Sequence, residues 1–308
     1  MKIEPQDFHE MVRQALREPA MARMRPVIEK ELLHYDILFC LEQSGLLDTL
    51  VFQGGTSLRL CYGANRFSED LDFAGGRDFD SKQLAVLKDC IEEYIGSRYG
   101  LEVGVKEPKS LMLEPTYKEL KIEKWQISIV TATNRRDIPK QRIKIEVANV
   151  PAYTKAAKPL IQNYKFLPDG YDDTLIYTET LDEVMADKLV SLPATRRYIR
   201  HRDIWDLAWL KQQKAVFNAD LVLQKLVDYK IDNFSSMLAE RIRSIPDIVN
   251  GDDFKGEMLR FLPTDIFERT IGKHKFNEYL INTLCDLLKE LESQLEENAE
   301  NMVGEFKM

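Results

Sequence analysis

Cysteines are scarce in this sequence, and the few that occur are far apart. The 308 residues include four of them, Cys40, Cys61, Cys90 and Cys285, and no CxxC pair. Zinc sites use closely spaced ligand pairs, and small disulfide-bonded domains need many cysteines in a short chain. The spacing favours neither kind of site, so we expect buried free thiols in a reducing compartment.

Long apolar segments are absent as well. No run of 18 or more apolar residues occurs, and residues 1–19 alternate charges where a signal peptide would have an apolar core. We therefore expect a cytoplasmic protein that does not associate with membranes.

Positive charge is in short supply. Lys and Arg together number 43 and Asp and Glu 51, which gives a formal net charge of −8 at pH 7. This balance excludes a protein whose whole surface is a basic mould for nucleic acid, but it leaves room for a local basic patch. With 44% hydrophobic and 31% charged residues, the composition is that of a globular protein of one large or two modest domains.

The first half of the chain alternates helix and strand patterns. An amphipathic helix is predicted over residues 25–43, and an apolar strand over residues 50–52 leads through Gly54 and Gly55 into a second helix. The remaining patterns are strands over 71–74, 102–105, 125–131 and 142–147, and a helix over 83–99. Residues 1–150 thus predict one α+β unit, a mixed sheet flanked by helices.

The second half is almost wholly helical in pattern. A loop rich in Pro, Lys and Asp over residues 151–173 comes first, and helices follow from Leu181 onward. We therefore expect a mainly helical domain over residues 151–308. Its tail, residues 286–308, holds seven acidic residues against two lysines, a net of −5. A solvated helix face explains this excess, and a partner-binding surface is the alternative.

Two carboxylates stand one residue apart on a predicted strand. Asp70 and Asp72 point to the same face because strand side chains alternate. Two like charges there repel unless a divalent cation lies between them. A metal site is therefore one interpretation, and two solvated aspartates at a strand edge are the other.

A glycine pair followed by hydroxyl residues precedes these carboxylates. Gly54, Gly55, Thr56 and Ser57 stand where a strand turns into a helix. The N–H groups and the dipole at a helix N-terminus favour phosphates, although glycines alone would indicate only a tight turn. A phosphate-binding turn beside a metal pair is typical of a nucleoside triphosphate site.

The run QGGTSLRLCYGANRFSEDLDF, residues 53–73, resembles the signature of the AbiEii/AbiGii group of nucleotidyltransferase-fold toxins. The MenT toxins also belong to this group, which lies within the broad DNA polymerase beta-like superfamily. The matching positions are Gly54, Gly55, Thr56, Asp70 and Asp72, with Arg66 and Ser68 in the family's Arg-x-Ser-x-Asp approach to the first aspartate.

A second match lies far downstream. The segment EVMADKLVSL resembles the family motif whose helical lysine reaches the nucleotide, here Lys188. The segment RHRDIWDL resembles the Arg-Asp-x-x-Asp-Leu motif, here Arg202, Asp203 and Asp206. The resemblance spans residues 28–210 and implies a nucleotidyltransferase fold, followed by a helical region that completes the active-site cleft.

The resemblance implies a role for each matching residue. Asp70 and Asp72 would bind Mg²⁺ or Mn²⁺ and act in catalysis, and Glu146, on the alternating strand 142–147, would be a third metal ligand. A salt-bridged surface glutamate is the alternative for Glu146. Lys188 and Asp206 would also act in catalysis. Asp206 is favoured over Asp203 because Asp203 could instead orient its helix. The expected nucleotide-binding residues are Gly54, Gly55, Thr56, Ser57, Arg66, Ser68, Lys188 and Asp203.

Two basic runs bear on the acceptor. Residues 135–144 carry five basic residues against one acidic residue, a net of +4. The second run comprises Arg196, Arg197, Arg200 and Arg202. An RNA backbone fits such runs, although charges that only confer solubility would look the same.

The implied function is therefore that of a toxin. It would transfer a nucleoside monophosphate from a nucleoside triphosphate to RNA, with the 3′ end of tRNA as the expected acceptor, and so block translation and growth. A cognate antitoxin protein would be its partner. Nucleotidylation or phosphorylation of a protein hydroxyl, such as one on the antitoxin, is the enzymatic alternative, and a non-catalytic nucleotide-binding module is the other.

Overall fold

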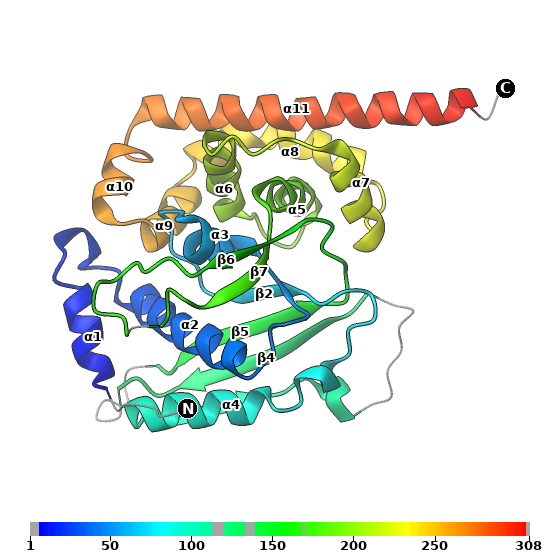
Figure 1. The fold of residues 1–308 in the computed structure, drawn as a ribbon. Coiled ribbons are helices and arrows are strands. Elements are labelled where there is room, and N and C mark those ends of the chain that lie inside the picture. The colour runs from blue at the N-terminus through cyan, green and yellow to red at the C-terminus, as the bar shows by residue number, and fades with distance from the viewer. Residues whose placement is uncertain (1–5, 113–119, 133–138, 169, 306–308) are drawn as a thin grey trace. The chain divides into compact units, whose positions relative to one another are not determined.

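The computed structural model describes residues 6–112, 120–132, 139–168 and 170–305, and the chain divides into two compact units (Figure 1). The first unit is Met1–Thr180 and the second is Leu181–Met308. In the described part of the chain, no helix has both the length and the apolar character needed to cross a membrane.

The first unit is built on a mixed sheet. Its strands in the described residues are β1 (Val51–Gln53), β2 (Leu71–Ala74), β3 (Val103–Lys106), β4 (Ile122–Ile129), β5 (Gln141–Ala148), β6 (Lys155–Pro159) and β7 (Leu175–Glu179). Their order in the sheet is β3-β4-β5-β2-β1-β7-β6. The pairs β1–β7 and β2–β5 are parallel and the others are antiparallel, so the predicted mixed sheet is confirmed.

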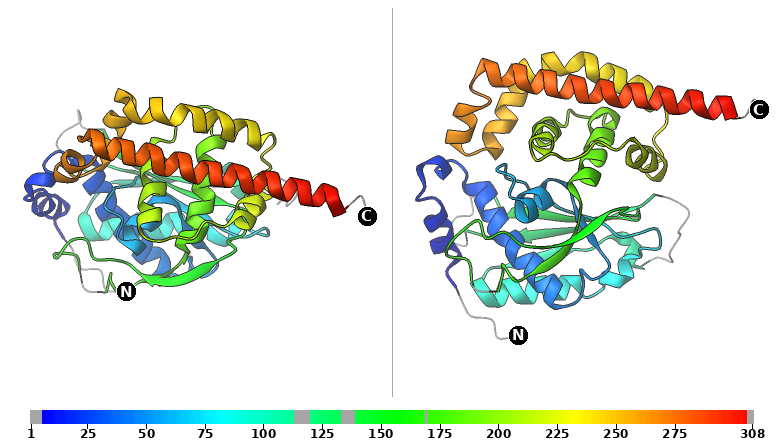
Figure 2. Two further views of the ribbon diagram at one scale, coloured as in Figure 1. Left: turned by 90° about the horizontal axis from the view of Figure 1, so that it is seen from above. Right: turned by 45° about the horizontal axis from the view of Figure 1, so that its top comes forward.

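Helices flank this sheet. They are α1 (Phe8–Ala15), α2 (Arg25–Gln43), α3 (Gly54–Tyr62) and α4 (Leu87–Tyr99). Helix α2 packs against α4 and β5, α4 also packs against β3, and α3 lies against β1 and β2 (Figures 1 and 2). Two of the predicted boundaries, those of α2 and β2, agree with the structure to the residue.

The two faces of the sheet differ in polarity. On β5, Ile143, Ile145 and Val147 are fully buried, whereas Lys144 and Glu146 between them are half-buried. Strand β2 alternates in the same way and places its apolar residues beside those of β5. Because strand side chains alternate in direction, one face forms the apolar core and the other carries charged groups. The charged face holds the predicted metal ligands.

The predicted division near residue 150 differs from the observed one. Strands β6 and β7 lie within or just after the segment expected to be a loop, and they extend the sheet beyond β1. The first unit therefore ends at Thr180. The short strand β6 ends in Pro159 and forms the edge of the sheet, where a missing N–H costs little, so its sequence is poor in strand signals.

The second unit is helical in all its described elements. These are α5 (Leu181–Ala194), α6 (His201–Gln212), α7 (Ala219–Asp228), α8 (Phe234–Asn250), α9 (Asp252–Phe261), α10 (Thr264–Arg269) and α11 (His274–Glu305). Helix α11 packs along α8 (Figure 2), and its last turns carry much of the acidic tail. The α+β fold followed by a mainly helical C-terminal region is thus confirmed.

All four cysteines are free thiols, as expected. Cys40 and Cys61 are buried, but Cys90 and Cys285 are only partly covered, so the prediction of burial holds for two of them.

Candidate active site

The glycine turn lies directly beside one of the carboxylates. Strand β1 passes into α3 without a loop, and Gly54 adopts a positive φ of +79°, which favours glycine. A Cβ atom at Gly54 would lie 3.0 Å from Asp72 Oδ2. The backbone at the start of α3 therefore approaches Asp72 as closely as it does because residue 54 has no side chain.

The second glycine makes room for two polar side chains. A Cβ atom at Gly55 would overlap Arg66 Nη2 and would lie 3.1 Å from Ser68 Oγ. Both side chains are buried, and Arg66 Nη1 donates a hydrogen bond to the Phe67 carbonyl oxygen at 2.6 Å. The guanidinium group and the hydroxyl thus lie against the first turn of α3. The structure brings together the predicted residues 54, 55, 66, 68 and 72.

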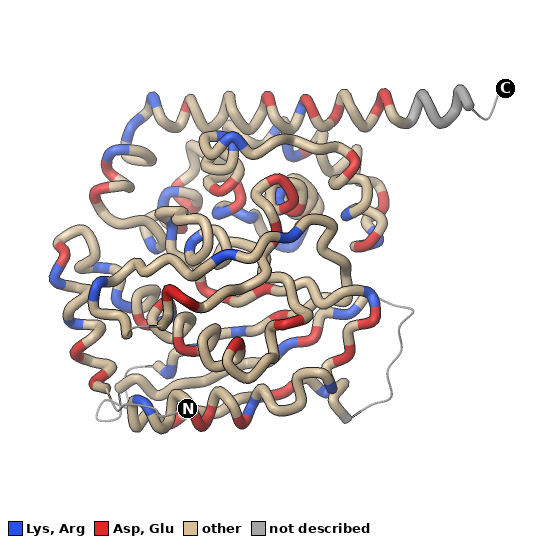
Figure 3. The backbone as a smooth tube through the Cα atoms, in the orientation of Figure 1, with Lys and Arg blue, Asp and Glu red and all other residues tan. Residues whose placement is uncertain are grey.

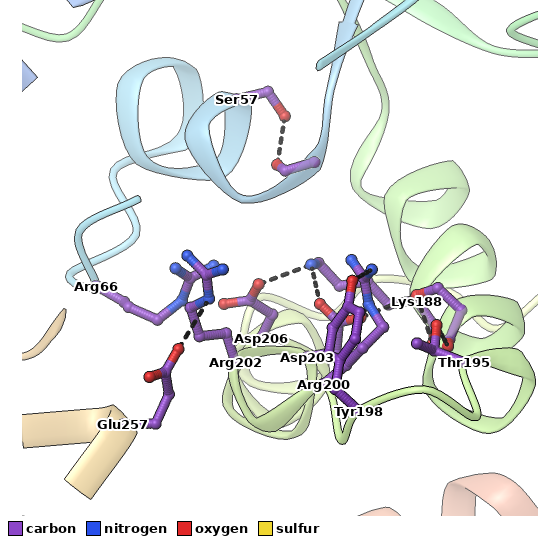
Figure 4. A network of polar contacts seen from close by, with 12 residues as sticks. Ser57, Arg66, Lys188, Thr195, Tyr198, Arg200, Arg202, Asp203, Asp206 and Glu257 are labelled. Atoms are coloured by element: carbon purple, nitrogen blue, oxygen red, sulfur yellow. Dashed lines mark hydrogen bonds and ion pairs between the residues drawn. The ribbon is translucent and has the colours of Figure 1, made fainter. Parts of the chain in front are cut away.

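The hydroxyl residues of the turn bond to backbone carbonyls. Thr56 Oγ1 donates to the Asp70 carbonyl oxygen at 2.5 Å, and Ser57 Oγ donates to the Gly54 carbonyl oxygen at 2.8 Å (Figure 4). Thr56 therefore ties α3 to the residue that precedes β2. The predicted role of Thr56 and Ser57 in phosphate binding stays a prediction, since these contacts show them holding the turn together.

The carboxylates meet across two neighbouring strands. Asp72 of β2 and Glu146 of β5 are direct partners in the parallel pair, and strands in a sheet lie about 4.8 Å apart. Register partners point to the same face, so Glu146 lies beside Asp72. Asp70, which directly precedes β2, contacts Lys144, two residues before Glu146 on β5.

Two lysines contact two of these carboxylates, Asp70 and Glu146. The Lys144 backbone N–H donates to Asp70 Oδ1 at 3.1 Å, and Lys144 Nζ lies 3.4 Å from Asp70 Oδ2. Attraction to Asp70 raises the pKa of Lys144 above its ordinary value. Lys124 Nζ of β4 lies 2.6 Å from Glu146 Oε1. Glu146 is therefore both salt-bridged and adjacent to Asp72, so the two interpretations of this residue do not exclude each other.

These residues fit a divalent cation by their chemistry. Asp70, Asp72 and Glu146 offer only carboxylate oxygens, the ligands that Mg²⁺ and Mn²⁺ prefer. Two of them bind a lysine ammonium group, so each can already hold a cation. Among the described residues, no three His, Cys, Asp or Glu side chains are grouped as a ready-made metal site. A metal ion would therefore have to draw these carboxylates together.

Sequence reasoning missed the contacts that fix the segment before Asp70. His34 Nε2 of α2 bonds to the Glu69 carbonyl oxygen at 2.8 Å, and Lys30 Nζ lies 2.8 Å from Glu69 Oε1. Burial of His34 lowers its pKa to about 4, so the imidazole is neutral and Nε2 is the donor. The available signal was the spacing of Lys30 and His34, which are four positions apart and so share one side of α2.

The predicted basic run at residues 135–144 is not a single free patch. Arg135, Arg136 and Asp137 lie outside the described residues. Lys140 pairs with Glu102 at 3.0 Å. Lys144 is the one in contact with Asp70. Acidic and basic residues are interspersed along the described chain (Figure 3).

The second unit holds the other predicted residues in a buried ion cluster. Lys188 Nζ of α5 lies 2.8 Å from Asp203 Oδ1 and 2.7 Å from Asp206 Oδ2 of α6 (Figure 4). Asp203 also accepts a hydrogen bond from Ser191 Oγ at 2.9 Å and pairs with Arg200. Lys188, Asp203 and Asp206 are each at most 5% exposed.

The neighbouring cations act on the Asp203 carboxyl group of this cluster. Burial acts to raise the pKa of Asp203, but attraction to Lys188 and Arg200 outweighs it and holds that pKa well below the usual value. In the second basic run, Arg202 lies 3.6 Å from Glu257, whereas Arg196 and Arg197 are exposed. The structure thus brings Lys188, Asp203 and Asp206 together. Their predicted roles in nucleotide binding and catalysis stay predictions.

Comparison with known proteins places this arrangement in a family. A sequence model described as "Nucleotidyl transferase AbiEii toxin, Type IV TA system" matches residues 36–282. No curated protein gives a significant sequence match. Among solved structures, the MenT4 nucleotidyltransferase toxin of Mycobacterium tuberculosis is similar over 94% of this chain and 92% of its own, with a TM-score of 0.56 and 18% identity. That likeness supports the fold.

Two Helicobacter pylori structures are also similar. A candidate nucleotidyltransferase matches 88% of this chain and 96% of its own at 19% identity and a TM-score of 0.47. The protein JHP933 matches 90% of this chain and 97% of its own at 18% identity and a TM-score of 0.44. The family match covers most of the sequence, including both motifs. The chain therefore belongs to the AbiEii family of nucleotidyltransferase toxins of type IV toxin–antitoxin systems.

Proposed function

We propose that this AbiEii-family enzyme transfers a nucleoside monophosphate from a nucleoside triphosphate to RNA, at the 3′ end of tRNA, in a reaction that requires Mg²⁺ or Mn²⁺. One observation carries the proposal. The turn that opens α3 lies against Asp72, and Asp72 is the register partner of Glu146. A helix end suited to phosphates therefore stands beside carboxylates suited to a divalent cation.

The residues of the sheet unit have distinct roles in this proposal. Asp70, Asp72 and Glu146 would hold the cation, which supplies charge neutralisation at the phosphate oxygens. The first N–H groups of α3 have no acceptor within the helix, and they form the positive end of the helix dipole. Both properties suit a triphosphate. Arg66, buried against Gly55, adds a fixed positive charge beside this turn.

We assign Lys188 and Asp206 of the helical unit to the same reaction. The support is the family motif together with the buried cluster, in which two carboxylates contact the Lys188 ammonium group. A charged lysine suits a triphosphate. Asp203 has contacts to Ser191, Lys188 and Arg200, so we assign it to positioning α5 and α6.

The biological setting follows from the family. A toxin of a toxin–antitoxin system has a cognate antitoxin, and we propose a protein for that partner. Modification of the tRNA 3′ end would remove the site of aminoacylation, block translation and stop growth. Both nucleoside triphosphates and tRNA are cytoplasmic, which places the reaction there.

The test is a labelling experiment with the purified protein. Total RNA is incubated with the protein, Mg²⁺ and each α-labelled nucleoside triphosphate in turn, and a parallel set uses γ-labelled nucleotide. We expect α-label on RNA of tRNA length, lost in Asp72→Asn and kept in the control Asp78→Asn, which alters an exposed aspartate. Growth inhibition should follow the same pattern.

Other outcomes would contradict the proposal in specific ways. α-Label on protein would indicate nucleotidylation of a protein hydroxyl, and γ-label on protein would indicate phosphorylation. Nucleotide-dependent thermal stabilisation without any transfer would indicate a binding module. Toxicity retained in Asp72→Asn would refute a catalytic role for this carboxylate.

A further inference from the structure

The predicted metal ligands and two lysines form two rows across the charged face of the sheet. In the first row, Asp72, Glu146 and Lys124 are successive register partners on β2, β5 and β4. In the second row, Asp70 lies beside Lys144 and contacts it through both the backbone N–H and the ammonium group. Each row thus contains a lysine ammonium group that a neighbouring strand supplies.

The charges in these rows nearly cancel. Three carboxylates would repel each other strongly in so small an area, since like charges on adjacent strands are destabilising. Lys124 Nζ lies 2.6 Å from Glu146, and Lys144 Nζ lies 3.4 Å from Asp70. Each ammonium group therefore contacts a carboxylate oxygen that a metal ion could otherwise bind.

We propose that Lys144 and Lys124 are resident counterions of the metal-binding carboxylates, and that a divalent cation competes with both ammonium groups when it binds. The proposal rests on the function proposed above, because the carboxylates are metal ligands only in that function. The lysines are positioning residues: they hold Asp70 and Glu146 in place before the cation arrives, and they compete with it.

The competition has a direction that can be measured. Both lysine side chains are about half exposed, at 43% for Lys144 and 49% for Lys124, so each pair is a surface ion pair of modest strength. Removing one ammonium group should tighten Mn²⁺ binding about threefold at low ionic strength. Removing both should tighten it about tenfold, if the two pairs act independently.

In the experiment, the full-length protein is titrated with Mn²⁺ alone. Calorimetry measures the affinity, and thermal unfolding measures the rise in Tm that Mn²⁺ causes. The variants are Lys144→Met, Lys124→Met and the double variant, and the matched control is Lys140→Met, whose exposed ion pair with Glu102 involves no predicted ligand. We expect tighter Mn²⁺ binding and a larger Mn²⁺-induced rise in Tm in the three variants, and wild-type values in the control. Lys144→Arg should restore wild-type affinity because it keeps the charge.

A second measurement separates competition from general loss of structure. In EDTA, Lys144→Met should melt about 2 °C below wild type, because Asp70 has lost part of its support. Unchanged or weaker Mn²⁺ binding in both single variants would overturn the counterion proposal while leaving the metal-dependent function in place. No Mn²⁺ binding by the wild-type protein would overturn the metal-dependent function, and the counterion proposal with it.

Discussion

At the scale of single residues, the turn at the candidate active site depends on a glycine that other residues can replace only with strain. Gly54 has a positive φ, and a Cβ atom at this position would lie 3.0 Å from Asp72 Oδ2. Gly54→Ala should therefore cost about 2 kcal/mol of stability and lower nucleotidyl transfer, because Asp72 must move. Urea unfolding and the labelling assay measure the two effects.

The control for this prediction is a glycine with room around it. Gly96 lies inside α4, and a Cβ there would meet only the Leu101 carbonyl oxygen at 3.9 Å. Gly96→Ala should stabilise the protein by about 0.5–1 kcal/mol, as alanine does inside a helix, and leave transfer unchanged. A Gly54→Ala variant with wild-type stability and activity would show that the turn has freedom we do not ascribe to it.

A second single residue makes the stability of the protein depend on pH. Buried His34 has its pKa lowered from 6.5 to about 4. Between these values the unfolded chain binds a proton that the folded protein does not, so stability is present above pH 6.5 and is lost as pH falls toward 4. At pH 5 this amounts to about 2 kcal/mol relative to pH 7.

The pH prediction is tested by replacing the imidazole with an amide. His34→Gln keeps a donor for the Glu69 carbonyl oxygen but cannot titrate, so its stability should fall less between pH 7 and pH 5 than that of wild type. Urea titrations at both pH values give the difference. His9 is exposed, and His9→Gln should behave as wild type. Equal pH dependence in His34→Gln and wild type would contradict the assignment.

At the scale of elements, α5 and α6 are joined by a buried ion cluster that sequence patterns do not reveal. Lys188→Met would take the ammonium group away from two buried carboxylates, Asp203 and Asp206, and should destabilise the protein by about 3 kcal/mol. The double variant Lys188→Met with Asp206→Asn removes both charges and should recover much of that loss. It should still be inactive in nucleotidyl transfer if both side chains act in the reaction.

Thermal melts and the labelling assay decide between two roles for this cluster. Lys211→Met alters an exposed lysine of α6 and serves as the control. A stable, active double variant would show that the cluster only joins the helices. A double variant as unstable as Lys188→Met would show that removing the charge of Asp206 does not offset the loss of the Lys188 ammonium group.

The elements show why some predictions succeeded and others did not. Helix α2 and strand β2 have strong local patterns, so their boundaries followed from periodicity alone. Strand β6 has the sequence KAAKP, which carries no such pattern, and it is a strand only because β7 pairs with it. Tertiary context overrides local propensity there.

The same distinction holds for the candidate site. Asp70 and Asp72 share a face by strand alternation, which a sequence displays directly. The pairing of Asp72 with Glu146 is a matter of strand register, and register is decided by packing across distant segments. The pattern around Lys188 would ordinarily indicate an exposed lysine, yet the side chain is 5% exposed, because its two carboxylate partners lie a helix away.

At the scale of the whole molecule, net charge says little about function. The balance of −8 excludes an all-over basic surface. In the structure, however, Lys144, Lys188 and Arg202 pair with carboxylates nearby, so the local balance at each site differs from the total. Binding of a nucleic acid would therefore depend on exposed basic groups, such as Arg196 and Arg197, and not on the net charge of the chain.

The segment that completes the first unit leads to the last prediction. Strand β7 pairs with β1, and Thr178 Oγ1 donates to the Phe52 carbonyl oxygen at 2.9 Å. The segment before β7 is tied in as well, since the Ile161 N–H donates to the Leu60 carbonyl oxygen at 2.7 Å. A chain that stops at residue 150 would lack these contacts and expose β1 as an unprotected sheet edge.

We therefore expect residues 1–180 to fold on their own and residues 1–150 to aggregate. The longer fragment should elute as a monomer in size-exclusion chromatography and melt cooperatively by circular dichroism, because it contains the whole sheet. The shorter one should form large species, because the edge of β1 and the apolar residues beside it would be open to other chains. If both fragments were equally monomeric and cooperative, β6 and β7 would be additions to a complete fold and the division at residue 180 would have no energetic meaning.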